Sequence, residues 1–322
     1  MSDRPVCIGT RDSRLAVWQA EYVADSLQRL GVRTRLQFVK TEGDRVLDTP
    51  LPLMGGKGVF TRALDEALLR GDIDIAVHSL KDIPTTVPEG LVMGAISTRE
   101  QPHDVLVPGE QHASRTPEEM EVFFATKGRQ AIIASSSNRR IGQWLSRFPH
   151  HRMVDIRGNI QTRLGKLASS SWDGAIFAAA GLTRLGMENR RYIPLHWMVP
   201  APGQGALGIM IRSDEGHLEA LLQTIHDERT AECVLAEREV LHRLQGGCSA
   251  PIGVHAFPAG EHIKMKVHVV YPDGTGAIHF VLEEPRNRVH LLAERAASQA
   301  FEMGADKLVQ VLTGKPGSSA ST

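Results

Sequence analysis

The sequence predicts two α/β units followed by a smaller α+β unit. Up to residue 178, short apolar runs alternate with longer segments in which apolar residues recur every three to four positions. This alternation is typical of strands and helices built around parallel sheets. After residue 223 the pattern changes to one helix, three strand-like runs and two further helical stretches, which indicates an α+β unit.

Each element of the two α/β units is predicted from apolar periodicity and from its end signals. Glycines close two of the helices, as is common after the last apolar residue of a helix. The first unit comprises strand 6–10, helix 15–30 closed by Gly31, strand 36–40, helix 61–70 closed by Gly71, and strand 73–77. The second comprises strand 131–134, helix 139–148, strand 152–156, helix 160–168 and strand 175–178.

The last third of the chain is predicted in the same way. Its expected elements are helix 231–244, strands 251–257, 263–270 and 276–283, and helices 287–302 and 305–312. A Tyr271-Pro272-Asp273-Gly274 turn joins the second and third strands, since Pro, Asp and Gly suit successive turn positions. Residues 314–322 are expected to form a polar tail.

The bulk properties exclude several classes of protein. With a formal net charge of zero, the total charge does not favour nucleic acid or an anionic membrane as a partner. No apolar run approaches transmembrane length, so the sequence predicts a cytoplasmic protein. The chain holds 28 Arg and 9 Lys, and Arg binds carboxylates or phosphates bidentately. An anionic small ligand is one interpretation, and a solvated Arg-rich surface is the other.

The three cysteines differ in their surroundings. Cys7 and Cys233 stand in apolar stripes and are expected in the core. Cys248 follows two glycines in Gly246-Gly247-Cys248-Ser249, between a helix pattern and a strand pattern. Such a thiol is poorly screened and could act covalently, although a helix-end loop that merely contains Cys gives the same pattern. The spacing does not suit a metal site or a disulfide set, so no metal is predicted.

Polar clusters follow the predicted strands where parallel sheets carry their chemistry, just past the carboxyl ends. Five clusters share this position: 11–13, 41–44, 78–82, 135–140 and 157–159. They predict a cleft between two α/β units, lined by cations and one carboxylate, although each could be an ordinary capped loop.

Other features carry less weight. Residues 42–58 form a long Gly- and Pro-rich connection, which predicts a lid or binding loop. Gly203–Gly208 fits a dinucleotide-binding glycine pattern, but prolines precede it and a strand-like run follows, so that function is rejected. His150 and His151 are expected at the solvated surface, and His78 is expected to be a buried strand residue without a catalytic role.

In these clusters the chain resembles the porphobilinogen deaminase family. The matching segments cover about the first 250 residues in order. They are Gly9–Ser13, Asp48–Pro50 with Gly55–Gly58, His78–Pro84, Ser136–Arg140, Arg157–Asn159 with Thr162–Leu164, Ala180–Gly186, Gly203–Ala206 and Gly246–Pro251.

The resemblance implies a fold and a reaction. It implies two domains similar to type 2 periplasmic binding proteins, formed by residues 1–97 with 201–216 and by 98–200. A third domain would span 217–313, and 314–322 would be the tail. The reaction would be the head-to-tail condensation of four porphobilinogen molecules with loss of ammonia, followed by hydrolytic release of hydroxymethylbilane. A monomer that binds neither nucleic acid nor membrane is expected.

The resemblance also implies residue roles. Asp82 matches the catalytic acid, and Cys248 matches the cysteine that holds a dipyrromethane cofactor by a thioether. The other cofactor-binding positions would be Lys81, Ser136, Ser137, Arg139, Arg140, Arg157 and Arg184. The substrate-binding positions would be Arg11, Ser13, Lys57, Arg157, Arg163 and Gln204.

The chain departs from the family pattern at a few positions. Family members commonly have Arg at position 42 and Lys at 53, where this chain has Glu42 and Leu53. Ser135, Asn138 and Val154 also depart. Glu42 and Leu53 leave open a catalytically weakened paralogue beside a working enzyme. An anion-binding module that uses the same two-domain fold without chemistry is a second alternative.

Overall fold

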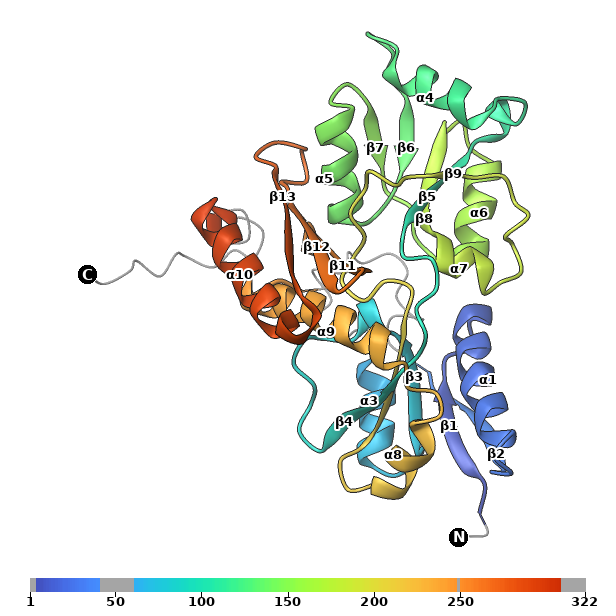
Figure 1. The fold of residues 1–322 in the computed structure, drawn as a ribbon. Coiled ribbons are helices and arrows are strands. Elements are labelled where there is room, and N and C mark those ends of the chain that lie inside the picture. Colours follow the sequence, from blue (N-terminus) through green and yellow to red (C-terminus); the bar gives the residue numbers. More distant parts are fainter. Residues whose placement is uncertain (1–3, 41–60, 248–249, 308–322) are drawn as a thin grey trace.

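The computed structural model describes residues 4–40, 61–247 and 250–307. Three sheets organise these residues (Figure 1). Two five-stranded sheets flanked by helices lie at the bottom and top of the view, and a three-stranded sheet with two helices lies beside them. The predicted fold class, two α/β units and a smaller α+β unit, is therefore confirmed.

The first sheet has the strand order β2-β1-β3-β10-β4. Helix α3 covers one face, and helices α1 and α8 cover the other. Its elements are β1 (Val6–Thr10), α1 (Arg14–Gln28), β2 (Thr34–Phe38), α3 (Arg62–Leu69), β3 (Ile75–Ser79), β4 (Leu91–Ile96), β10 (Leu207–Arg212) and α8 (Gly216–Leu222). Gly31 and Gly71, with φ of 77° and 76°, follow α1 and α3 in the left-handed conformation that glycine adopts without strain.

The second sheet has the order β7-β6-β8-β5-β9. Helices α4 and α5 pack on one face, and α6 and α7 pack on the other. Its elements are β5 (Asp104–Pro108), the short helix η3 (Glu110–His112), α4 (Pro117–Ala125), β6 (Ile132–Ala134), α5 (Asn138–Arg147), β7 (Arg152–Val154), α6 (Ile160–Ala168), β8 (Gly174–Ala178), α7 (Ala179–Thr183) and β9 (Ile193–Pro194).

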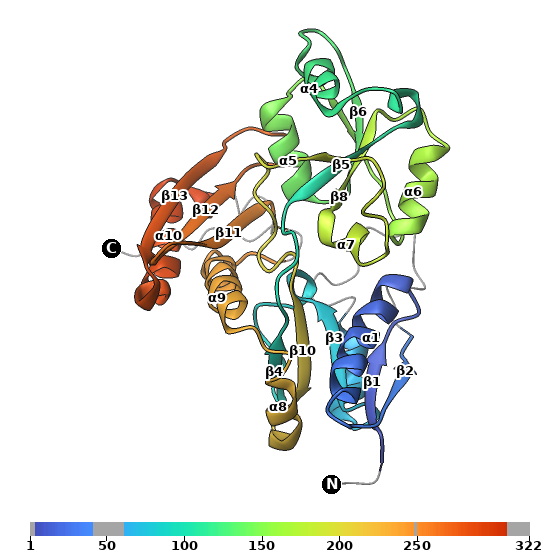
Figure 2. The same cartoon turned by 45° about the vertical axis from the view of Figure 1, so that its right-hand side comes forward.

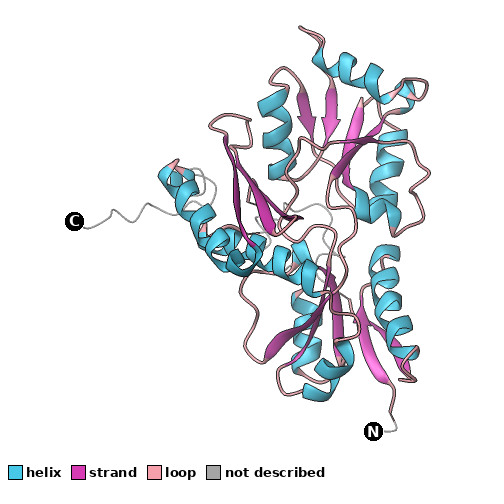
Figure 3. Cartoon of the chain, viewed as in Figure 1, coloured by secondary structure: helices cyan, strands magenta, loops and turns pink. Residues whose placement is uncertain are grey.

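The expectation of purely parallel sheets is wrong. Strand β10 runs antiparallel to β3 and β4, and β5 runs antiparallel to β8 and β9. The chain leaves the first sheet after β4, enters the second as β5 and returns to the first as β10. Each crossing thus inserts a reversed strand, whose amino end lies beside the carboxyl end of a neighbour. Figure 3 shows both sheets with helices along their faces.

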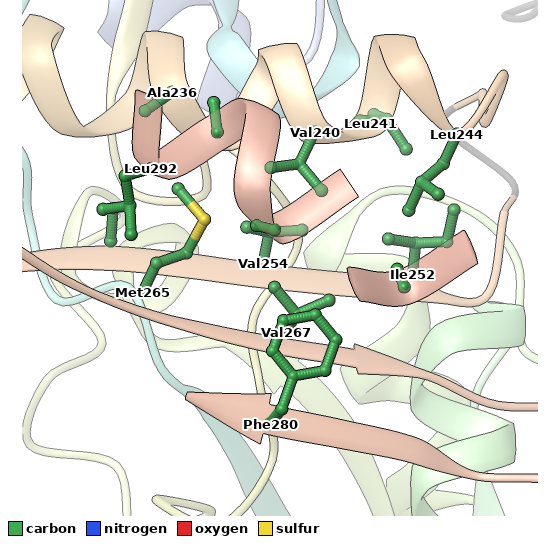
Figure 4. Close-up of a cluster of buried hydrophobic side chains, with 14 of the residues drawn as sticks. Ala236, Val240, Leu241, Leu244, Ile252, Val254, Met265, Val267, Phe280 and Leu292 are labelled. Atoms are coloured by element: carbon green, nitrogen blue, oxygen red, sulfur yellow. The ribbon is translucent and has the colours of Figure 1, made fainter. Parts of the chain in front are cut away.

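The third sheet is antiparallel, in the order β11-β12-β13. Its elements are α9 (Glu228–Arg243), β11 (Ile252–Ala259), β12 (His262–Val269), β13 (Ile278–Pro285), the short helix η4 (Arg286–Arg288) and α10 (Val289–Glu302). Alternate residues of β12 are buried, so one face of the sheet meets α9 and α10. Val240, Val254, Val267 and Leu292 lie in this core (Figure 4). In the predicted turn, the Gly274 amide donates to the carbonyl oxygen of Tyr271 at 2.8 Å.

Helix α8 packs on the first sheet. Its side chains Leu218 and Leu222, followed by Ile225, pack with Ile8 and Ile209 of the first sheet. We therefore propose that this unit reaches residue 225 rather than 216, and the other domain boundaries stay predictions. No helix in the described ranges combines the length and apolar character needed to cross a membrane.

The buried cysteines and one histidine complete the core. Cys7 and Cys233 are buried as expected, and burial raises the pKa of both thiols, that of Cys233 to about 11. His151 is also buried, so its predicted place at the surface is wrong. Its ring stacks on Phe148 with centroids 5.0 Å apart, and its Nδ1 accepts from Trp144 Nε1 at 3.1 Å. This aromatic packing outweighs the polarity of the ring, whereas His150 is exposed.

Candidate active site

The centre of the site is the short helix η2 (Leu80–Asp82), which directly follows β3. Leu80 and Ile83 are buried and anchor this segment in the first core. The Leu80 amide also donates to the carbonyl oxygen of Ala206 at 3.0 Å, which ties the segment to the strand that returns from the second sheet. Between these anchors Lys81 is half-buried and Asp82 is exposed. The fold thus presents a carboxylate to solvent on a segment that is fixed at both ends.

A cavity of about 80 Å³ lies beside Asp82. Arg11 and Ser13, both predicted as substrate-binding, line it together with Asp82. Ser13 caps α1, because its hydroxyl accepts from the Ala16 amide at 3.3 Å. A larger cavity, of about 280 Å³, lies against Trp144, Phe148 and Trp197 of the second unit, but it contains no predicted site residue. We place the site at the smaller cavity because charged groups converge there.

His78 also lines the smaller cavity, although the sequence suggested no role for it. Burial, together with the nearby Arg11, lowers the pKa of His78 to about 4. The ring is therefore neutral at pH 7. Its Nε2 is buried without a hydrogen-bond partner among the described residues.

Asp104 is the site residue that the sequence reasoning missed. It is fully buried at the start of β5 and accepts from Arg139 Nη1 at 2.7 Å and from Arg140 Nη2 and Nε at 2.8 and 3.1 Å. Gln204 Nε2 donates to the same carboxylate at 2.9 Å. These donors hold the pKa of Asp104 well below its usual range despite its burial. The sequence held one signal that could have identified Asp104, namely an acidic residue directly before the apolar run Val105–Val107.

Gln204 connects this buried cluster to η2. Its Oε1 accepts from Lys81 Nζ at 3.2 Å, while its Nε2 donates to Asp104 and to the carbonyl oxygen of Pro102. Burial lowers the pKa of Lys81 to about 8, and the neighbouring Arg139 and Arg140 contribute in the same direction. The structure therefore brings together Lys81, Arg139, Arg140 and Gln204 from both α/β units.

Among the other predicted residues of the second unit, Ser136, Ser137 and Arg157 lie on the loops after β6 and β7, and Arg163 lies in the first turn of α6. Arg163 Nε donates to the carbonyl oxygen of Gly158 at 2.7 Å, and Arg157 Nε pairs with Asp155 at 2.6 Å. Ser136 fixes these loops to each other, because its hydroxyl accepts from the Ile156 amide at 3.1 Å. Ser137 is the N-cap residue of α5, without a side-chain cap bond.

Arg163 interacts electrostatically with Asp82 of the first unit. Burial is the main cause that lowers the pKa of Arg163, and repulsion from Arg140 lowers this pKa further. Attraction to Asp82 raises it. Groups from both α/β units thus influence one another across the site.

Arg184 has a different environment from the other predicted cations. It is buried, and it pairs with Glu100 at 3.1 Å and donates to the carbonyl oxygen of Gly205 at 2.6 Å. These contacts fasten the second unit to the segments that connect it to the first. Cys248 and Lys57, the departures Glu42 and Leu53, and the whole of the predicted lid 42–58 lie outside the described residues.

The charge balance of the cluster indicates what it can bind. Within the described part of the chain, the five cations Lys81, Arg139, Arg140, Arg157 and Arg163 interact with three carboxylates, Asp82, Asp104 and Asp155. Burial is the main cause of the lowered pKa of Lys81, and Arg139 and Arg140 add repulsion that a bound carboxylate would relieve. The described residues contain no group of three His, Cys, Asp or Glu side chains arranged for a metal.

Comparisons with known proteins find similar sequences over nearly the whole chain. Residues 6–220 match the family model described as "Porphobilinogen deaminase, dipyromethane cofactor binding domain", and residues 231–306 match "Porphobilinogen deaminase, C-terminal domain". A porphobilinogen deaminase of Pelotomaculum thermopropionicum is 39% identical over 95% of this chain and 96% of its own length. That of Syntrophotalea carbinolica is 40% identical over 97% of each chain.

A solved structure from another group of proteins shows a weaker likeness. The probable amino-acid ABC transporter extracellular-binding protein of Bacillus subtilis is 12% identical, with a TM-score of 0.42 over 69% of this chain and 91% of that chain. At this level the likeness carries no argument.

Proposed function

This chain belongs to the porphobilinogen deaminase family, and from that membership we propose how its residues perform the reaction. The protein is a transferase, a hydroxymethylbilane synthase of tetrapyrrole biosynthesis. Four porphobilinogen molecules are condensed head to tail with loss of ammonia, and water then releases the linear product. The single observation that supports the residue assignment is the excess of cations beside one exposed carboxylate, Asp82.

Asp82 is proposed as the acid and base. Deamination requires a proton for the departing amine and then a negative charge that offsets the positive charge left on the pyrrole ring. A carboxyl group can do both in turn. Asp82 suits this role because it is exposed at the cavity while its segment is held by buried Leu80 and Ile83. Lys81 and Arg163 lie close enough to Asp82 to interact with it electrostatically.

The cationic cluster is proposed to hold carboxylate groups of cofactor and substrate. Dipyrromethane, when bound, supplies the pyrrole carbon to which the substrate is joined. The cluster fits this anionic group because its positively charged side chains outnumber its carboxylates. Lys81, Ser136, Ser137, Arg139, Arg140, Arg157 and Arg184 are proposed on the cofactor side. Arg11, Ser13, Lys57, Arg157, Arg163 and Gln204 are proposed on the substrate side.

The covalent attachment of the cofactor to Cys248 is also proposed, by a thioether. Its support is the sequence context, a thiol after two glycines at the end of the α9 segment, together with the burial of Cys7 and Cys233. Intact-protein mass tests it. Protein expressed with porphobilinogen available should exceed the sequence mass by two condensed pyrrole units, and Cys248→Ala should lack this excess. A wild-type mass equal to that of the bare chain would overturn the assignment.

We further propose that the enzyme acts as a cytoplasmic monomer, as expected from the family resemblance and the composition. Light scattering of the loaded enzyme at working concentration tests the monomer. A mass of twice 35.3 kDa would contradict it.

A further inference from the structure

Arg238, on helix α9, contacts the segment that carries Asp82. It is 7% exposed and belongs to a helix that also packs on the third sheet. Its guanidinium donates to the carbonyl oxygens of Leu80, Ile83 and Pro84 at 3.3, 2.8 and 2.7 Å. The proposed roles of the predicted residues do not use this side chain.

The three acceptors bracket the catalytic position. Leu80 precedes Lys81 and Asp82, whereas Ile83 and Pro84 follow them. A planar guanidinium has five N–H donors in a fixed fork, so it can hold several carbonyl groups in one arrangement, as a single ammonium group cannot. Within the described part of the chain, the Ile83 amide bonds inside this same segment, to the carbonyl oxygen of Leu80 at 3.2 Å. Arg238 therefore bonds the residues that follow Asp82 to helix α9, which is a separate element of the fold.

Helix α9 is a firm support for this contact. The adjacent Glu237 is fully buried and pairs with Arg99 at 2.6 and 3.1 Å. Glu237 also accepts from the amides of Gly203 and Ala256, each at 2.7 Å. The helix is thus bonded to the segment between β4 and β5, to the segment before β10 and to β11. Figures 1 and 2 both show α9 between the third sheet and the first.

We propose that Arg238 is a positioning residue that sets the location of Asp82 from helix α9. This inference rests on the proposed role of Asp82 as the acid. Arg238 touches neither substrate nor cofactor in this account, and it acts through the backbone of residues 80–84. A misplacement of a reacting group by about 1 Å can reduce turnover on the order of a hundredfold.

The test compares Arg238→Ala with Arg243→Ala in the cofactor-loaded enzyme. Arg243 lies on the same helix but is exposed and pairs with Glu239 at 2.7 Å, so its loss should leave kcat unchanged. Arg238→Ala should lower kcat by roughly ten- to a hundredfold with KM changed less than about threefold. Added guanidinium ion at non-denaturing concentration should restore part of kcat, which a merely destabilised protein would not show.

A double mutant separates positioning from general damage. In the Asp82→Asn background, Arg238→Ala should reduce the residual kcat by less than about twofold, because the group it positions is already absent. Equal fold losses with and without Asp82 would overturn the proposal, as would normal kcat in Arg238→Ala. Near-normal turnover of Asp82→Asn itself would instead refute the proposed acid.

If Arg238→Ala does not fold, Arg238→Lys provides the second variant. Its single ammonium group can retain a carbonyl contact and the charge, but it cannot span all three acceptors. It should fold and load cofactor while kcat falls by at least about fivefold. Wild-type kcat in Arg238→Lys would show that the fork geometry is not required and would overturn the proposal.

Discussion

Replacing Asp104 by Asn should destabilise the second α/β unit strongly. The substitution keeps the size of the side chain but leaves two buried guanidinium groups, those of Arg139 and Arg140, against a neutral amide. Removing one partner of a buried ion pair costs about 3–5 kcal/mol. Each arginine keeps one carbonyl acceptor, Val199 at 2.8 Å and Ile176 at 3.1 Å. We therefore expect the low end, a loss of about 3 kcal/mol in the free energy of unfolding.

Urea unfolding of cofactor-free protein, followed by tryptophan fluorescence, measures this loss. Three of the four tryptophans, Trp144, Trp172 and Trp197, lie in the second unit or just after its last strand and report on its unfolding. The matched control is Asp72→Asn, which removes an exposed ion pair with Arg70 at 2.8 Å. That control should cost no more than about 1 kcal/mol.

The pH dependence gives a second check on Asp104. Its pKa lies below the ordinary value of 3.8, so its carboxylate contributes stability that is fully present above that value and is lost as the pH falls. The difference between wild type and Asp104→Asn should therefore narrow below about pH 4. A variant within 1 kcal/mol of wild type at pH 7, with native circular dichroism, would refute the view that this carboxylate offsets both arginines.

Three further predictions concern the proposed chemistry. Asp82→Asn should lower turnover by on the order of a hundredfold or more while cofactor mass and fold persist, and near-normal turnover would place the acid elsewhere. Arg139→Leu should block cofactor loading, so its intact mass should equal the bare chain, whereas a loaded, fully active variant would contradict the assignment. Arg163→Leu should load cofactor but raise KM or slow chain elongation in single-turnover assays, because its side chain is only half-buried and lies in the first turn of α6; unchanged kinetics would remove it from the site.

Local sequence was sufficient for most of the secondary structure. Strand β1 and helix α6 match their predicted ranges, since apolar periodicity, an Asn159 cap and the following polar residues all act within one turn or strand. Strand β3 lies two residues later than predicted, because the apolar Ile73 looks like the start of the strand, whereas pairing with β1 begins at Ile75. The clustering of Arg11, Lys81 and Asp82 at strand ends likewise followed from the parallel part of the sheet.

Only the tertiary structure placed Asp104 at the site and bonded it to Gln204, which the family resemblance had already suggested. Asp104 is the first residue of β5, and Gln204 lies just before β10; both strands run antiparallel to their neighbours. The sequence analysis looked for site residues only after the carboxyl ends of strands, so these positions at amino ends gave no signal. Strand direction is set by the crossing of the chain between sheets, which is a long-range property. Burial explains the contacts of Asp104. A buried carboxylate needs hydrogen-bond donors, so Asp104 pairs with Arg139 and Arg140. From the sequence, these two arginines were expected only to bind carboxylates of a ligand. The contact of Arg238 with residues 80–84 spans more than 150 positions, and no local pattern could have indicated it.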